Sequence, residues 1–383
     1  MKIFIVAGEE SGDTLGAGLM AELKALHPGE ISFRGVGGSG MQAQGLQTLF
    51  PMEDITAMGF AQVIAGLPRI LRRMRETADA IIADPPDLLV LIDAPDFTHR
   101  VAHKVRARLP GLPIVKYVAP TVWVWRPGRA HRMAPDIDQV LAVLPFEPKF
   151  MNDLGGPPTT YVGHPLLSEL WRLRPNAQEA ARRASQPPLL LVLPGSRRAE
   201  LARLGDVFGQ ALGALKTGGQ EFELVLPTLP RRIAQVEAMI ATWPVKPRVV
   251  VDEAEKYAAF RQARAALAAS GTVTLELALA GVPMVTAYKV PKFEGWIGGM
   301  VLTGTSVILP NIILGENVVP EFLQQRCTAD ALTRTLAGVI KDGPERQSQI
   351  DAFSRLDDIL SLAGDTPSRR AAIAVLATKR SRA

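Results

Sequence analysis

Short, continuously apolar segments alternate with helical segments along nearly the whole chain, and this alternation restricts the fold more than any other feature. In the first half we expect strands at residues 2–7, 31–36, 87–92, 113–118, 139–143 and 159–162. Amphipathic patterns typical of helices lie between them, for example at 14–26, 67–82 and 97–109. Strands that are apolar throughout are typical of parallel sheets covered by helices on both faces. The first half therefore predicts a doubly wound α/β domain.

The same pattern starts again after the breaker-rich stretch Ser185-Gln186-Pro187-Pro188. Further strands are expected at 189–193, 223–226, 248–251, 265–268 and 284–287. We therefore predict an α/β fold of two Rossmann-like, doubly wound domains that face each other across a cleft. Their expected ranges are 1–165 and 187–345, with helices in 346–383 that pack back on the first domain.

Composition limits the class of protein. A chain of 383 residues, 47% apolar and 21% charged, is typical of two well-packed soluble domains. The single cysteine, Cys327, excludes an internal disulfide and a cysteine-rich zinc site. The apolar segment 3–8 is too short for a signal peptide, because acidic residues follow at once, and we expect a cytoplasmic protein.

The net charge of +5 indicates an anionic partner. The sequence contains no nucleic-acid-binding signature, so we expect a phosphorylated substrate or an anionic membrane surface rather than nucleic acid. An apolar segment, 58–68, is followed by Arg69, Arg72, Arg73 and Arg75. This arrangement fits either a helix that settles on an anionic bilayer or an ordinary core helix with a basic solvated face.

Ligands of doubly wound folds bind beyond the carboxyl ends of the strands, so the loops there hold the candidate site residues. The first such loop is Gly8-Glu9-Glu10-Ser11-Gly12-Asp13. Its carboxylates would repel a bare phosphate. We therefore expect it to contact sugar hydroxyls, through Gly8, Glu9, Ser11 and Gly12, or to form a purely structural turn with Asp13 as the helix N-cap.

A second loop, Asp93-Ala94-Pro95-Asp96-Phe97, places two carboxylates directly after an apolar strand. A general base is expected at such a position. Asp96 immediately precedes the predicted helix and suits an N-cap, although a substrate contact is also open to it. Asp93 is therefore the better candidate for the catalytic base.

Two loops of the second half are candidate nucleotide-binding loops. In Pro194-Gly195-Ser196-Arg197, Gly195 permits close backbone approach, Ser196 offers a hydroxyl and an N-cap, and Arg197 can clamp a diphosphate. In Ser270-Gly271-Thr272, backbone amides at a helix start are available to an anion, and Glu276 lies one turn further on, suited to ribose hydroxyls. The alternative is in each case a capped helix with exposed charges.

Two other motifs have weaker functional interpretations. Gly35, Gly37 and Gly40 match G-x-G-x-x-G, but they follow the second predicted strand of the domain instead of the first, so dinucleotide binding is disfavoured. Trp123 and Trp125 lie near Arg126 and would form either a cleft wall or part of the core, and the core is favoured.

Taken together, these residues resemble the lipid-A-disaccharide synthases. The resemblance rests on Asp93-Ala94-Pro95-Asp96-Phe97, Pro194-Gly195-Ser196-Arg197, Ala269-Ser270-Gly271-Thr272 with Glu276, and Pro310-Asn311-Ile312-Ile313, which occur in the order typical of that family. The opening loop, Trp123-Val124-Trp125-Arg126 and Leu144-Pro145-Phe146-Glu147 agree as well. Glu10 stands where the family leads us to expect threonine, and Thr98 where it leads us to expect asparagine.

The resemblance implies a GT-B fold and an inverting transfer without metal or cofactor. UDP-2,3-diacylglucosamine and 2,3-diacylglucosamine 1-phosphate (lipid X) would give a β-1,6 disaccharide and UDP. It also implies that Asp93 is the base, that Arg197 binds the UDP phosphates, that Asn311 is a further essential residue, that Glu276 contacts ribose and that Gln324 lies near the nucleotide. A peripheral position on the inner membrane and a homodimer formed through the C-terminal segments are consistent with it.

Three other functions remain open at this point. Another GT-B enzyme, either a UDP-sugar epimerase or a transferase acting on a polyprenyl-linked sugar, would share most of these features. A non-catalytic UDP-sugar-binding protein would bind UDP without depending on Asp93. An NAD-dependent oxidoreductase would use the glycine motif at residues 35–40.

Overall fold

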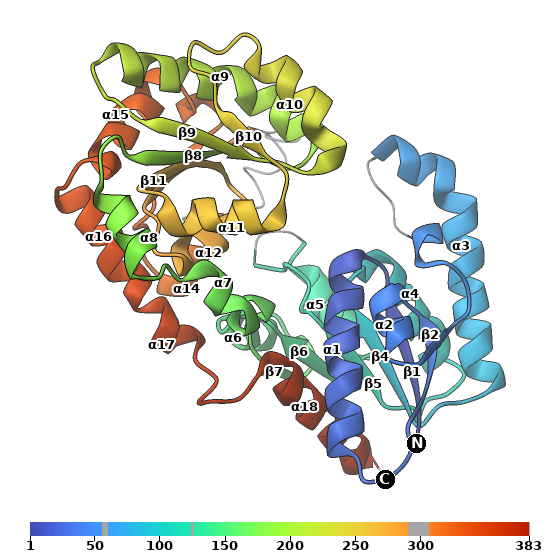
Figure 1. Ribbon diagram of the computed structural model, residues 1–383. Helices are drawn as coiled ribbons and strands as arrows, with labels where there is room; N and C mark the ends of the chain where they lie inside the picture. Colours follow the sequence, from blue (N-terminus) through green and yellow to red (C-terminus); the bar gives the residue numbers. More distant parts are fainter. Residues whose placement is uncertain (56–59, 124–125, 290–305, 383) are drawn as a thin grey trace. The chain divides into compact units, whose positions relative to one another are not determined.

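The computed structural model describes residues 1–55, 60–123, 126–289 and 306–382. The chain forms two compact units, one of Met1–Leu167 together with Leu360–Ala383 and one of Ser168–Ile359. Each unit is built around its own sheet (Figure 1). The second unit begins at Ser168, earlier than the expected 187, and it also includes the segment 346–359, which was expected to pack on the first domain.

The first unit contains a seven-stranded sheet in the order β3-β2-β1-β4-β5-β6-β7. All of its strand pairs are parallel. The strands are β1 (Lys2–Ala7), β2 (Ser32–Val36), β3 (Leu46–Thr48), β4 (Leu88–Ile92), β5 (Ile114–Tyr117), β6 (Gln139–Ala142) and β7 (Thr159–Tyr161). Six of these were expected from the sequence. The exception, β3, has only three residues and too little apolar pattern to predict a strand.

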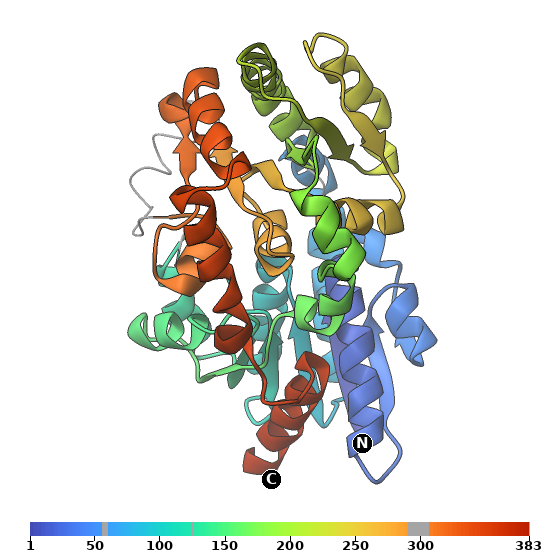
Figure 2. The ribbon, with the colours of Figure 1, turned by 60° about the vertical axis from the view of Figure 1, so that its left-hand side comes forward.

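Helices cover this sheet, as apolar strands without polar alternation require. They are α1 (Glu10–Leu26), α2 (Ser39–Ala43), α3 (Phe60–Ala83), α4 (Pro95–Arg106), α5 (Gly128–Met133), α6 (Glu147–Asp153) and α18 (Pro367–Arg382), with short 3-10 turns at Met52–Asp54 and Pro165–Glu169. Although α1 and α18 lie at opposite ends of the sequence, they pack side by side (Figures 1 and 2). The Arg369 guanidinium of α18 lies 3.6 Å from the Glu22 carboxylate of α1.

The second unit contains a six-stranded parallel sheet in the order β10-β9-β8-β11-β12-β13. Its strands are β8 (Leu189–Leu193), β9 (Glu223–Pro227), β10 (Arg248–Val250), β11 (Ala265–Ala269), β12 (Met284–Tyr288) and β13 (Glu321–Leu323). Five were expected; β13 is a three-residue edge strand whose residues are only partly buried.

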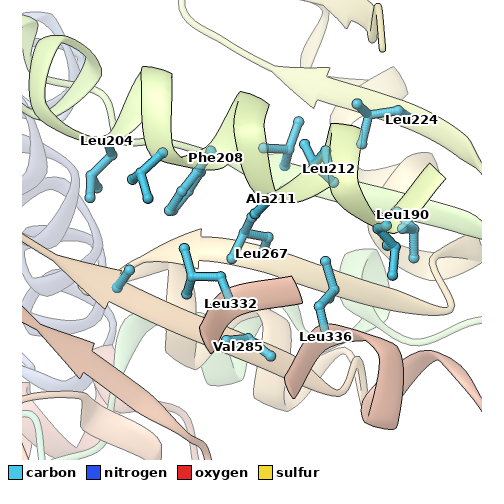
Figure 3. Packing of buried hydrophobic residues seen from close by; sticks show 14 of the residues in the cluster. Leu190, Leu204, Phe208, Ala211, Leu212, Leu224, Leu267, Val285, Leu332 and Leu336 are labelled. Carbon is cyan, nitrogen blue, oxygen red and sulfur yellow. The ribbon is translucent and has the colours of Figure 1, made fainter. Parts of the chain in front are cut away.

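The helices of the second unit are α7 (Leu170–Leu173), α8 (Ala177–Ala184), α9 (Arg198–Thr217), α10 (Ile233–Ile240), α11 (Glu253–Gln262), α12 (Val273–Leu279), α14 (Leu309–Leu314), α15 (Ala329–Ile340) and α16 (Pro344–Ser354), and α17 (Leu356–Leu360) leads back to the first unit. Short 3-10 turns lie at Pro230–Arg232 and Gln324–Arg326. The apolar sides of α9 and α15 pack on the sheet, where Phe208, Leu212, Leu267 and Leu336 are almost fully buried (Figure 3). In the described part of the chain, no helix is long and apolar enough to cross a membrane.

Each sheet has one topological switch point. In the first unit the chain runs outward from β1 through β2 and β3, then returns to continue from β4 on the other side. In the second unit the corresponding neighbours are β8 and β11. A switch point leaves a crevice at the carboxyl ends of two adjacent strands, and ligands bind there in open α/β sheets. The fold thus singles out the loops after β1 and β4, and those after β8 and β11.

Candidate functional site

The loop after β1 is mainly a structural turn. Helix α1 begins at Glu10, with Glu9 as the N-cap residue, so the expectation that Asp13 caps the helix is wrong. Instead the buried Asp13 carboxylate accepts hydrogen bonds from the amides of Gly38 and Gly40, both at 2.8 Å, and of Met41 at 3.0 Å. Asp13 therefore holds the glycine-rich loop after β2 in place.

This contact also explains the G-x-G-x-x-G pattern without a dinucleotide. A Cβ added at Gly35 would lie 1.8 Å from the carbonyl oxygen of Ile5, and one added at Gly40 would lie 2.9 Å from Asp13 Oδ2. The glycines are needed for close packing against β1 and α1. Close packing therefore accounts for these glycines without a bound dinucleotide.

The loops after β1 and β4 touch each other. A Cβ added at Gly8 would lie 2.6 Å from the Ala94 Cβ, so only glycine permits this approach. A Cβ added at Gly12 would lie 3.3 Å from the Ala7 Cβ of β1 and 3.5 Å from Cγ2 of Ile92 in β4. Glu9 and Ser11 are exposed. Gly8 thus allows close contact between the loops after β1 and β4, and Gly12 allows α1 to pack closely against the first sheet.

Asp93 lies at the carboxyl end of β4 in a left-handed backbone conformation. Its φ is 46° and that of Ala94 is 41°, and non-glycine residues rarely adopt such values. The strain is held by neighbours, since the Asp93 amide donates to the Tyr117 carbonyl at 3.0 Å and the Thr98 hydroxyl donates to the Asp93 carbonyl at 2.9 Å. Strained backbone of this kind is concentrated at functional sites.

A buried lysine underlies this loop, and the sequence-based reasoning did not identify it. Lys116 of β5 is 1% exposed and donates hydrogen bonds to the carbonyl oxygen of Asp93 and, at 3.0 Å, to the Thr98 hydroxyl. Desolvation by burial lowers the pKa of Lys116 to about 7, opposed by the negative charge of Asp93. The sequence feature that could have identified this lysine is its position as the one charged residue in the otherwise apolar segment 113–118.

Asp96 does not cap α4. The helix begins at Pro95, and the N-cap residue is Ala94. The exposed Asp96 carboxylate instead forms an ion pair with Arg129 of α5 at 2.7 Å. Asp96 is therefore near Asp93 in sequence but has a cationic partner of its own, which favours Asp93 as the base.

In the second unit, the loop after β8 already holds an internal anion. The Glu200 carboxylate, 12% exposed, accepts hydrogen bonds from the amides of Ser196 at 3.1 Å and Arg197 at 3.2 Å, and it pairs with the Arg197 guanidinium at 2.9 Å. The N-cap residue of α9 is Arg197, so the expected Ser196 cap is wrong. These are the donors that the sequence assigned to a diphosphate.

The loop after β11 lies beside the loop after β8, because Ala268 pairs with Leu193. Ser270 and Gly271 follow β11, and Thr272 is the N-cap residue of α12. The Glu276 carboxylate accepts a hydrogen bond from Lys256 of α11 at 2.7 Å. Lys256, which sequence-based reasoning missed, also lies 4.7 Å from the centre of the Tyr257 ring.

Asn311 is buried within the second unit. Its side-chain amide nitrogen donates to Ser306 Oγ at 3.2 Å and to the Val319 carbonyl at 3.0 Å, and its oxygen accepts from the Val319 amide at 2.9 Å. With 3% exposure, the side chain braces the segment between α14 and β13. Gln324, partly buried, follows β13 with a φ of 52°.

Trp123 is a core residue, as favoured from the sequence: it is 7% exposed and its ring packs edge-on against Phe146 at 5.0 Å. Trp125 lies outside the described residues, as do Met58 and Gly59 at the start of the apolar segment 58–68. Among the described residues, no group of three or more histidine, cysteine or carboxylate side chains could hold a metal ion.

Sequence comparisons agree on one family. The family model described as Lipid-A-disaccharide synthetase matches residues 3–374. A Lipid-A-disaccharide synthase of Nitrobacter hamburgensis is 55% identical over 377 residues, covering 98% of this chain and 95% of that protein. One from Rhodospirillum centenum is 43% identical over 377 residues, covering 98% and 94%.

Structural comparisons give the fold. The UDP-GlcNAc 2-epimerase of Neisseria meningitidis, solved with UDP-GlcNAc bound, has a TM-score of 0.64 at 11% identity over 98% of this chain and all of that one. The calicheamicin glycosyltransferase CalG4 has a TM-score of 0.60 at 16% identity over 100% and 99%. The two-sheet α/β architecture is that of the GT-B glycosyltransferases.

Proposed function

Because the chain belongs to the lipid-A-disaccharide synthetase family, we propose that it transfers 2,3-diacylglucosamine from its UDP derivative to 2,3-diacylglucosamine 1-phosphate. The product is a β-1,6-linked disaccharide 1-phosphate, and UDP is released. The observation that carries the proposal is the position of the family's loops: the two pairs of expected site loops follow the strands that flank the switch points, β1 with β4 and β8 with β11.

The first unit supplies the base. The 6-hydroxyl oxygen of the acceptor attacks the anomeric carbon of the donor, the bond from that carbon to the UDP oxygen breaks, and the hydroxyl proton passes to the Asp93 carboxylate. A single displacement inverts the anomeric centre. The side-chain nitrogen of Lys116 and the hydroxyl of Thr98, which both donate to the Asp93 carbonyl, keep the loop in the strained conformation that presents this carboxylate.

The second unit holds the leaving group. Negative charge grows on the UDP diphosphate as the bond breaks, and preorganised donors stabilise such charge. The amides of Ser196 and Arg197 and the Arg197 guanidinium are grouped around one carboxylate, that of Glu200. Donors that already hold an anion are suited to a diphosphate after Glu200 moves aside. Amides after Ser270 and the Glu276 carboxylate would hold the rest of the nucleotide.

The reaction also requires access to lipid substrates, and we place the enzyme peripherally on an anionic membrane surface. In α3, Leu67 is 45% exposed, and the neighbouring Arg69, Arg72 and Arg75 are exposed as well. An exposed apolar residue beside arginines is suited to the interface of an anionic bilayer. Flotation with phosphatidylglycerol liposomes tests this: Leu67→Gln should reduce the bound fraction, and a wild-type protein that stays unbound contradicts it.

Incubation with both acylated substrates, followed by mass analysis, tests the reaction itself. The proposal predicts a disaccharide 1-phosphate and one UDP for each disaccharide. Turnover of unacylated UDP-N-acetylglucosamine to its epimer, or transfer to a polyprenyl-linked acceptor with none to the acylated sugar, would instead support another GT-B activity. UDP binding with no product from any of these substrates would support a binding protein.

A further inference from the structure

A strongly cationic cavity lies within the first unit, between α3, α4 and α5. Its volume is about 600 Å³. Among its described lining residues, six are lysine or arginine and two are aspartate. The six are Arg75, Arg100, Lys104, Arg126, Arg129 and Arg132.

Local ion pairs do not neutralise it. Asp96 pairs with Arg129 at 2.7 Å, and Asp136 lies 3.0 Å from His103. Four further cations, Arg75, Arg100, Lys104 and Arg132, have no acidic partner among the described residues. Cations gathered around one concavity repel each other and raise the local concentration of anions.

The charged residues of α4 that line the cavity lie on one face of the helix. Asp96 and Arg100 are four residues apart, as are Arg100 and Lys104, and this spacing aligns side chains. His99 also lines the cavity, and its buried Nε2 has no hydrogen-bond partner in the described part of the chain. Burial, together with the charges of Lys116 and Arg129, lowers the His99 pKa to about 3, so the imidazole is neutral. An unpaired buried nitrogen is uncommon, and an anionic ligand at this wall would give it a partner.

The position of the cavity connects it with the proposed base. Pro95 and Asp96, which begin α4, form part of its wall, and Asp93 precedes them by two and three residues. An acceptor whose hydroxyl lies at Asp93 therefore has this cavity within reach of its other end. Among the described lining residues there is no tryptophan, tyrosine or phenylalanine, and the described wall is cationic instead of aromatic.

We infer that this cavity binds the phosphate monoester of the acceptor, an inference that rests on the proposed function. A phosphate monoester carries nearly two negative charges near neutral pH, and arginine forks bind such a group with paired hydrogen bonds. A phospholipid headgroup, which is a phosphodiester with a single charge, is the other source of lipid-borne phosphate. The excess of four cations over local acidic partners favours the monoester.

The double variant Arg100→Ala/Arg132→Ala tests the inference with two acceptors, 2,3-diacylglucosamine 1-phosphate and the same sugar without phosphate. Loss of charged hydrogen bonds to the phosphate should raise the KM for the phosphorylated acceptor by about tenfold or more. The KM values for the unphosphorylated acceptor and for the UDP donor should not change. Arg108→Ala, an exposed arginine near the end of α4 outside the cavity, is the matched control.

Binding of soluble glucosamine 1-phosphate, measured by calorimetry, gives a readout that does not need turnover. The wild type and Arg108→Ala should bind it, and the double variant should not. An unchanged KM ratio between the two acceptors, or equal binding by all three proteins, overturns the inference. So does a double variant that loses binding to phosphatidylglycerol vesicles while keeping its KM for the phosphorylated acceptor.

The two proposals fail separately. If the wild type makes no disaccharide but still binds glucosamine 1-phosphate through Arg100 and Arg132, the proposed function is wrong. The cavity then remains a binding site for a sugar phosphate. A wild-type protein that makes the disaccharide, with a double variant that is kinetically unchanged, contradicts the cavity assignment alone.

Discussion

The buried side-chain nitrogen of Lys116 donates a hydrogen bond to the backbone carbonyl of Asp93. The contact joins β5 to the loop after β4 and holds Asp93 at a φ of 46°. A lysine 1% exposed is costly to keep charged, because burial removes its hydration. Through this hydrogen bond, a residue buried in the first sheet fixes the backbone conformation of the proposed base.

We expect Lys116 to make stability depend on pH. The pKa is lowered from 10.5 to about 7 in the folded protein, so between these values the unfolded chain binds a proton that the folded chain lacks. Stability should therefore rise with pH from about 7 towards 10, with a slope of up to about 1.4 kcal/mol per pH unit. Urea unfolding at pH 7, 8 and 9 should show this slope in Lys24→Met, an exposed control, and not in Lys116→Met. Equal slopes in both variants would refute it.

Asn311 should prove to be a positioning residue. Asn311→Ala leaves the Val319 amide and carbonyl without their partner, which we expect to cost about 2–3 kcal/mol of unfolding free energy. Asn311→Asp should cost a similar amount, because a carboxylate cannot donate to the Val319 carbonyl. Denaturant unfolding measures both. Full stability in both variants, together with lost turnover, would instead indicate direct contact with substrate.

Asn311 illustrates where sequence-based reasoning reaches its limit. Most strands were predictable because their apolar residues are contiguous, but the three-residue strands β3 and β13 were not. The candidate loops followed from the rule that ligands bind beyond the carboxyl ends of parallel strands. The partners of Asp13, Glu200 and Asn311 were not predictable, since a carboxylate or amide at a helix start suits a cap, a ligand contact or a tertiary brace equally well. Only folding brings Asp13 to the Gly38 and Gly40 amides, 25 and 27 residues away.

The Asp13 brace should matter for stability. Asp13→Ala removes the acceptor of three backbone amides, and we expect a loss of about 2–4 kcal/mol. Glu10→Ala, an exposed change in the same turn, should have little effect. Thermal and urea unfolding of the two variants make the comparison. A stable Asp13→Ala protein would show that the loop after β2 holds its shape alone.

Glu200 should compete with the diphosphate for the loop after β8. Glu200→Gln removes a negative charge from the Ser196 and Arg197 donors, so UDP should bind about fivefold more tightly, a change of about 1 kcal/mol. Glu237→Gln on α10 is a control that leaves this loop intact. Calorimetric titration with UDP decides the matter. Unchanged or weaker binding in Glu200→Gln would mean that the carboxylate only supports the loop.

The central claim, that Asp93 activates the acceptor while the second unit holds UDP, is tested most directly by measuring turnover and UDP affinity in the same two variants. For Asp93→Asn the account predicts a fall in kcat of at least about a hundredfold with UDP affinity unchanged, as expected for loss of a general base. For Arg197→Ala it predicts that both fall. Wild-type turnover in Asp93→Asn would contradict the account.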